Sequence, residues 1–105
     1  TTPHDAYADD MVLAEGIDRY QQHVTTEITR VETTWAGLRS FVADRTLVLG
    51  HDPACPNFVW CAAQGGYGFQ TAPAASQLIA DLVFGHQSVL DAATIAALSP
   101  ARFAK

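Results

Sequence analysis

A glycine-rich stretch in the second half of the chain limits the possible folds most strongly. It runs from Ala62 to Thr71, with glycines at positions 65, 66 and 68, and its first two residues end the apolar run Phe58–Ala63. An uninterrupted apolar run of this length is typical of a strand that is covered on both sides. The glycines then predict a sharp turn, and a helix is expected to follow from about Ala72, with Thr71 or Ala72 as its cap.

The rest of the chain alternates between helical and extended patterns. Apolar residues at helical spacing predict a helix over residues 5–23, and the β-forming residues of 25–42 predict a strand. A polar turn at 43–46, a short strand at 47–50 and a loop at 51–57 follow. Beyond the glycines we expect a helix over 72–84, with Pro73 in its first turn, Gly85 past its end and an inner face made by Ala75, Leu78, Ile79 and Leu82. Asp91 should cap a last helix, 92–98, closed by Ser99-Pro100, so the fold class is α+β.

Composition excludes several classes of protein. The chain has 105 residues, of which 49% are hydrophobic, so it can build one small domain and is not a disordered tail. No apolar run approaches the roughly 20 residues of a membrane span, and there is no signal-like N-terminus. A net charge of −5 argues against nucleic-acid binding. We expect a soluble, cytoplasmic protein.

Cysteine and histidine positions predict no metal site. Cys55 and Cys61 are too far apart for a redox or zinc pair, and the four histidines are scattered. Cys61, in the apolar run, is interpreted as a small buried hydrophobe. Asp81 is interpreted as a solvated helix position.

Arg39 is the first candidate for chemistry. On the predicted strand it shares a face with Gly37 and Phe41, so its guanidinium should emerge from an apolar surface and bind a carboxylate bidentately. That carboxylate could belong to a ligand, or to the protein's own Asp44 or Glu32. Trp35, further along the strand, is assigned to the core, whereas Tyr67 could equally be structural or line a site.

The glycine turn is the second candidate. Glycines allow a backbone to approach a flat ring, because a Cβ atom would collide with it. The helix that follows aims unpaired N–H groups and the positive end of its dipole at whatever lies there.

In the residues they contain and in their order along the chain, the segments Thr34–Phe41 and Ala62–Thr71 resemble the C-terminal part of the FAD-dependent D-amino-acid oxidase and glycine oxidase superfamily. Within it they resemble the D-arginine dehydrogenase type. The resemblance extends from about Ile17 to Phe103. It implies FAD as cofactor and identifies residues 1–105 as a single segment from the C-terminal part of a two-domain flavoprotein. Residues 1–60 would be part of the antiparallel substrate-binding α+β domain. Residues 61–105 would be the flavin-contacting turn and the C-terminal helices that pack on the FAD-binding domain.

The resemblance also implies an activity, the oxidation of a D-amino acid or related amine to the imino or 2-oxo acid by hydride transfer to flavin. Arg39 would bind the substrate carboxylate, the Gly66 carbonyl would accept from the amine, and Tyr67 would lie beside the substrate. Gln70 and Thr71 would donate to the pyrimidine side of the flavin. The implied cofactor contacts are Gly65, Gly66, Tyr67, Gly68, Phe69, Gln70 and Thr71.

Part of such an enzyme is missing from this sequence. The dinucleotide-binding pattern Gly-x-Gly-x-x-Gly is absent, and the only methionine, Met11, lies inside a helical pattern. We therefore expect the remainder of the FAD-binding enzyme, on the same or a separate chain, as partner. Two alternatives stay open: the small subunit of a hetero-oligomeric amine oxidase or dehydrogenase, and a non-catalytic interaction domain that keeps the fold.

Overall fold

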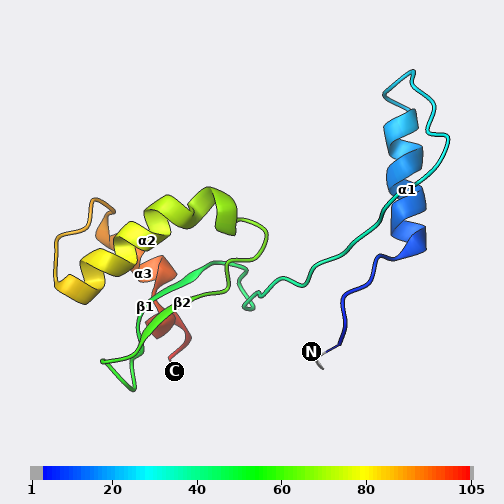
Figure 1. Ribbon diagram of the computed structural model, residues 1–105. Helices are drawn as coiled ribbons and strands as arrows, with labels where there is room; N and C mark the ends of the chain where they lie inside the picture. Colours follow the sequence, from blue (N-terminus) through cyan, green and yellow to red (C-terminus); the bar gives the residue numbers. More distant parts are fainter. Residues whose placement is uncertain (1–3, 105) are drawn as a thin grey trace. The chain divides into compact units, whose positions relative to one another are not determined.

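The computed structural model describes residues 4–104, which form two compact units that divide between Leu38 and Arg39 (Figure 1). The first unit, up to Leu38, holds the helix α1, Asp10–Gln21. The second unit, from Arg39, holds a two-stranded antiparallel sheet, two α-helices and a 3-10 helix. This mixture of helices with an antiparallel sheet confirms the α+β class. The division of the chain between two domains of a flavoprotein stays a prediction.

Helix α1 begins later than predicted because Asp9 caps it. One carboxylate oxygen of Asp9 accepts hydrogen bonds from the amides of Met11 and Val12, at 2.9 and 3.1 Å. These are amides that an α-helix cannot satisfy internally, so an acceptor there fixes where the helix starts. The predicted start at Asp5 is wrong for this reason. Leu13 and Ile17, from the predicted apolar face, are half-buried.

The strand predicted over residues 25–42 is absent from the described part of the chain. No stretch of these residues forms a strand, and Trp35, which was assigned to the core, is 83% exposed. A strand is defined by a hydrogen-bonded neighbour, and among residues 4–104 only β1 and β2 pair with each other. Residues with β propensity therefore stay irregular here, because propensity does not supply a partner.

The sheet of the second unit is a hairpin. Strand β1, Val48–His51, pairs with β2, Val59–Ala62, so that Leu49 lies opposite Cys61 and Gly50 opposite Trp60. The loop between them is organised by Asp52. One of its carboxylate oxygens accepts from the amides of Ala54 and Cys55, and the other accepts from the indole N–H of Trp60 at 2.8 Å.

One face of the hairpin is covered by helix α2, Gly68–Phe84 (Figure 1). The core consists of Leu49, Ala75 and Leu78, and the predicted inner face of the helix is thereby confirmed. The partly buried residues packed against this core are Leu47, Ile79, Leu82, Leu90, Ile95 and Leu98. Trp60 and Cys61 are exposed, so the prediction that β2 is covered on both sides, with Cys61 buried, is wrong. Helix α2 packs on β2 but leaves these two side chains accessible.

The end of the chain follows the predicted order. Helix α3, Ala92–Leu98, is capped by Asp91, whose carboxylate accepts from the Thr94 amide at 2.8 Å. A 3-10 helix, η1, then spans Pro100–Phe103 and contacts β1. Asp81 departs from prediction, because it is buried at 5% exposure rather than solvated. The side-chain amide of Gln77 donates to it at 2.8 Å and compensates part of the cost of burial.

Candidate functional site

The glycine turn joins β2 to α2. Ala63, at the end of β2, has a positive φ of 58°, as does Gly65 at 54°, and the chain turns through residues 65–67 before α2 begins at Gly68. Gly66 therefore lies in a strand-to-helix turn, as expected. The predicted helix start at Ala72 is wrong by four residues, since Gly68 and Phe69 are already helical. Thr71 is not the cap: it lies inside α2 and its hydroxyl donates to the Tyr67 carbonyl at 2.9 Å.

The three glycines of the turn differ in what a side chain at their position would meet. A Cβ on Gly65 would lie 2.7 Å from Cε1 of Phe41, which is closer than real Cβ contacts come, and one on Gly68 would lie 3.1 Å from Cβ of Gln64. A Cβ on Gly66 would meet nothing within 4 Å among the described residues, and its φ is not in the left-handed region. Nothing in the described part of this chain requires glycine at position 66.

The segment that carries Arg39 lies against this turn. The amide of Gly65 donates to the carbonyl of Ser40 at 3.0 Å, and the ring of Phe41 packs on Gly65. The guanidinium of Arg45 lies over the same Phe41 ring, 5.6 Å from its centroid. The sequence does not predict that Ser40 and Phe41 contact the turn, because no pattern in a sequence signals a contact between segments this far apart.

Arg39 itself is exposed, and within residues 4–104 its side chain makes no ion pair or hydrogen bond. The two acids weighed as its partners bind other arginines. Asp44 pairs with Arg102 at 2.7 Å, and Glu32 pairs with Arg30 at 2.6 Å. The structural alternative for Arg39 therefore has no support from the contacts of the described chain.

The first turn of α2 presents unsatisfied donors. An α-helix cannot satisfy its first amides internally, here those of Gly68, Phe69 and Gln70. Tyr67 stands at the N-cap position and makes no side-chain cap hydrogen bond, and the first turn contains no acid. Tyr67, Phe69 and Gln70 are exposed. This end of the helix can thus accept the carbonyl oxygens or partial negative charge of a ligand.

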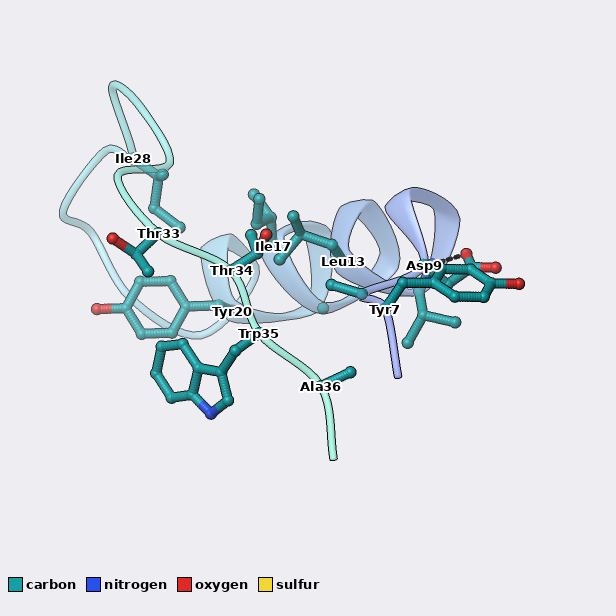
Figure 2. A pocket seen from close by; sticks show the side chains of 13 residues that line it. Tyr7, Asp9, Leu13, Ile17, Tyr20, Ile28, Thr33, Thr34, Trp35 and Ala36 are labelled. Carbon is teal, nitrogen blue, oxygen red and sulfur yellow. Dashed lines mark hydrogen bonds between the residues drawn. The ribbon is translucent and has the colours of Figure 1, made fainter. Parts of the chain in front are cut away.

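A groove in the first unit lies along α1 and is separate from the glycine turn in sequence. It encloses about 720 Å³ between α1 and residues 28–36. Figure 2 shows Tyr20 and Trp35 at one end of this groove and Tyr7 at the other. Its lining is mostly apolar, with Asp9 as the one charged side chain, and that carboxylate is occupied as the cap of α1.

A second groove, of about 440 Å³, lies in the second unit beside Trp60, Pro100 and Phe103. Its one charged side chain is Asp52. The Trp60 indole N–H, followed by the Ala54 amide, holds the pKa of Asp52 below its ordinary value of 3.8. Asp52 is therefore ionised at neutral pH and organises the loop; it is not poised for proton transfer.

Residues 4–104 offer neither a cluster of metal ligands nor a membrane-spanning helix. Among residues 4–104, no three His, Cys, Asp or Glu side chains are grouped so that they could hold a metal ion. Across the same residues, no helix is both long and apolar enough to cross a membrane.

Part of the chain matches a known protein family. The model of a family described as "FAD dependent oxidoreductase" matches residues 1–82. The matched part is more than half of the chain, and it includes Arg39 and the entire turn from Gly65 to Thr71.

Proposed function

Because this chain belongs to the family of FAD-dependent oxidoreductases, we propose that it supplies the substrate-carboxylate and flavin-ring contacts of a cytoplasmic enzyme that oxidises a D-amino acid. The substrate could also be a related amine, and the product is the imino or 2-oxo acid. In this proposal the chain is the C-terminal part of the enzyme. The remainder of the FAD-binding enzyme, on the same or a separate chain, provides the contacts that Gly-x-Gly-x-x-Gly makes elsewhere.

The hydrogen bond between Gly65 and Ser40 carries the proposal. It holds the segment of Arg39 directly beside the glycine turn, at 3.0 Å between amide nitrogen and carbonyl oxygen. A cationic side chain and an open helix N-terminus are thereby presented from adjacent backbone. A zwitterionic substrate that lies against a flat, electron-accepting ring needs both.

Arg39 has the chemistry to orient the substrate. Its guanidinium is planar and permanently charged, and it can bind a carboxylate through two parallel hydrogen bonds. Since Asp44 and Glu32 are paired with Arg102 and Arg30, its donors remain available for a ligand.

The turn has the chemistry to orient the substrate amine. Within residues 4–104, the Gly66 carbonyl accepts no hydrogen bond, and Gly66 is exposed. A protonated amine can donate to that oxygen while the carboxylate rests on Arg39. Two anchors fix both the position and the face of the Cα–H bond, which is how binding lowers the barrier of a transfer reaction.

The turn also fits the edge of a flavin ring. The open space at Gly66 admits a flat group, and the amides of Gly68, Phe69 and Gln70 can donate to ring carbonyls. FAD, the cofactor of the family, supplies the hydride-accepting chemistry when bound. The contribution of these residues is position and a positive field from α2.

A substrate panel with one arginine variant tests this proposal. The complete flavoprotein should oxidise D-amino acids, D-arginine included, and Arg39→Ala should reduce kcat/KM by the equivalent of about 3–5 kcal/mol because the substrate carboxylate loses its partner. Arg19→Ala, an exposed arginine on α1, is the control and should change kcat/KM little. An unchanged kcat/KM in Arg39→Ala would remove Arg39 from the site.

The two alternatives are outcomes of the same experiment. A yellow, active complex that requires a second polypeptide identifies the chain as a small subunit of a hetero-oligomeric flavoprotein. A chain that binds its partner without flavin or turnover identifies a non-catalytic interaction domain. Size-exclusion chromatography with a flavin absorbance trace separates these cases.

A further inference from the structure

We propose that Phe41 is a positioning residue that couples the Arg39 segment to the glycine turn, so that the side chain sets where the substrate carboxylate rests relative to Gly66. This inference rests on the proposed function of Arg39 and Gly66. Phe41 touches neither substrate nor cofactor in this proposal; it acts through Gly65.

The first observation is steric. The Phe41 ring lies so close to Gly65 that an added Cβ would fall 2.7 Å from Cε1 and 3.1 Å from Cδ1 of the ring. Gly65 has a φ of 54°, which glycine adopts readily and other residues adopt at a cost. The ring therefore occupies the space that a side chain at position 65 would fill, and only glycine fits beside it in this conformation.

The second observation is the neighbouring hydrogen bond. The carbonyl of Ser40, between Arg39 and Phe41, accepts from the amide of Gly65 at 3.0 Å. One bond alone leaves the two segments free to rotate about it. The Phe41 ring adds a second point of contact on the same glycine, and two points fix an orientation that one cannot.

The third observation is that the Phe41 ring has a second contact, with the side chain of Arg45. The Arg45 guanidinium lies 5.6 Å from the ring centroid, within the range of a cation–π contact. Arg45 itself has a positive φ of 58° in the turn after the segment. The ring thus contacts both a cation and the glycine turn although it is 50% exposed.

Phe103 offers a matched control in the same unit. It is 45% exposed and also lies beneath an arginine, with the Arg102 guanidinium 4.2 Å from its centroid, but it belongs to η1 and not to the turn. Truncating Phe41 and Phe103 removes similar apolar area from similar surroundings. Only the first truncation removes a contact with Gly65.

The experiment uses the complete flavoprotein and the variants Phe41→Leu, Phe41→Met, Phe41→Tyr and Phe103→Leu, each checked for stoichiometric flavin. In Phe41→Leu and Phe41→Met we expect KM for D-arginine to rise on the order of tenfold, with a smaller change in kcat. The Kd of acetate, followed by the visible absorbance of the flavin, should rise in parallel. Phe41→Tyr keeps the ring and should restore wild-type values, and Phe103→Leu should match wild type throughout.

The outcomes separate this inference from the proposed function. If Arg39→Ala raises KM while the flavin-replete Phe41→Leu or Phe41→Met does not, the role of Phe41 is wrong and that of Arg39 stands. If Arg39→Ala leaves kcat/KM unchanged, the proposed role of Arg39 fails and the role of Phe41 fails with it. A fall in melting temperature shared by Phe41→Leu and Phe103→Leu, without a KM difference between them, also overturns the inference.

Discussion

The guanidinium of Arg102 binds the carboxylate of Asp44 through two nitrogens, Nε to Oδ2 at 2.7 Å and Nη2 to Oδ1 at 3.2 Å. Its other donors reach the carbonyls of Thr46 and Leu98, at 3.0 and 2.8 Å. The pair ties η1 to the turn that precedes β1. The Arg102 hydrogen bond, followed by the Thr46 amide, holds the pKa of Asp44 below its ordinary value of 3.8.

Asp44→Asn should lower the stability of the second unit at neutral pH. Because the pKa of Asp44 is lower in the folded than in the unfolded chain, its stabilisation is complete above about pH 4 and is lost as pH falls through the folded value. The difference in free energy of unfolding between wild type and Asp44→Asn should therefore shrink on acidification. Denaturant titrations of both proteins at about pH 7 and about pH 3 measure this difference in free energy of unfolding.

Glu32→Gln provides the control for this prediction. Glu32 and Arg30 are as close as the Asp44 pair, at 2.6 Å, but both side chains are exposed. Exposed pairs contribute little, so Glu32→Gln should leave the unfolding free energy nearly unchanged. A difference between wild type and Asp44→Asn that stays constant with pH would contradict the ionic account of the Asp44 pair.

Gly65→Ala should destabilise the fold, whereas Gly66→Ala should leave the fold intact and weaken substrate binding. Alanine at position 65 must adopt a left-handed conformation and displace Phe41, at a cost of roughly 1–2 kcal/mol in stability from the backbone alone. Alanine at position 66 meets nothing within 4 Å in the described chain and should fold normally.

The functional readout of this pair is KM for D-arginine in the complete flavoprotein. Gly66→Ala should raise KM, because the methyl group projects into the space assigned to the ring and the substrate amine. A Gly66→Ala enzyme with wild-type KM and wild-type flavin absorbance would show that the open side of Gly66 is not the ligand side.

Arg39→Lys should recover only part of the activity lost in Arg39→Ala. The ammonium group restores the charge, but it is a compact point charge that cannot reproduce the planar fork of a guanidinium. We expect kcat/KM to lie between the values of wild type and Arg39→Ala, with the larger part of the deficit in KM. Equal activity in the lysine variant and the wild type would favour simple charge attraction over bidentate binding.

The purified 105-residue chain should be colourless and should bind FAD no more tightly than micromolar. Its sequence lacks the pattern that holds the pyrophosphate, and the turn offers contacts to the ring alone. Equilibrium dialysis against FAD measures this affinity, as the flavin absorbance of the protein solution in excess of that of the buffer. A tightly bound yellow chromophore in the chain alone would refute the assignment of the pyrophosphate site to another part of the enzyme.

Features of the chain that depend on neighbouring residues could be predicted from sequence. The cap of α3 at Asp91 and the end of α2 at Gly85, which has a φ of 69°, follow from preferences that act within one helical turn. The start of α2 was missed because Pro73 favours a first-turn position, whereas here it lies inside the helix.

Features that depend on distant parts of the chain could not be predicted. Trp35 and Cys61 are exposed and Asp81 is buried, against expectation, because burial is decided by what packs on a residue and not by its type. The same holds for the candidate site. Arg39 and the glycines can be identified as candidates from the sequence, but the contacts of Gly65 with Ser40 and Phe41 are visible only in the fold.

The support that Phe41 gives to Gly65 has a consequence for protein engineering. A graft of residues 64–71 into another strand-to-helix junction would transfer the glycines without the ring and the carbonyl on which Gly65 rests. The transplanted loop would then sample several conformations, since glycine has the largest backbone entropy to lose. A working transplant of this turn has to be bipartite, with residues 39–41 moved together with it.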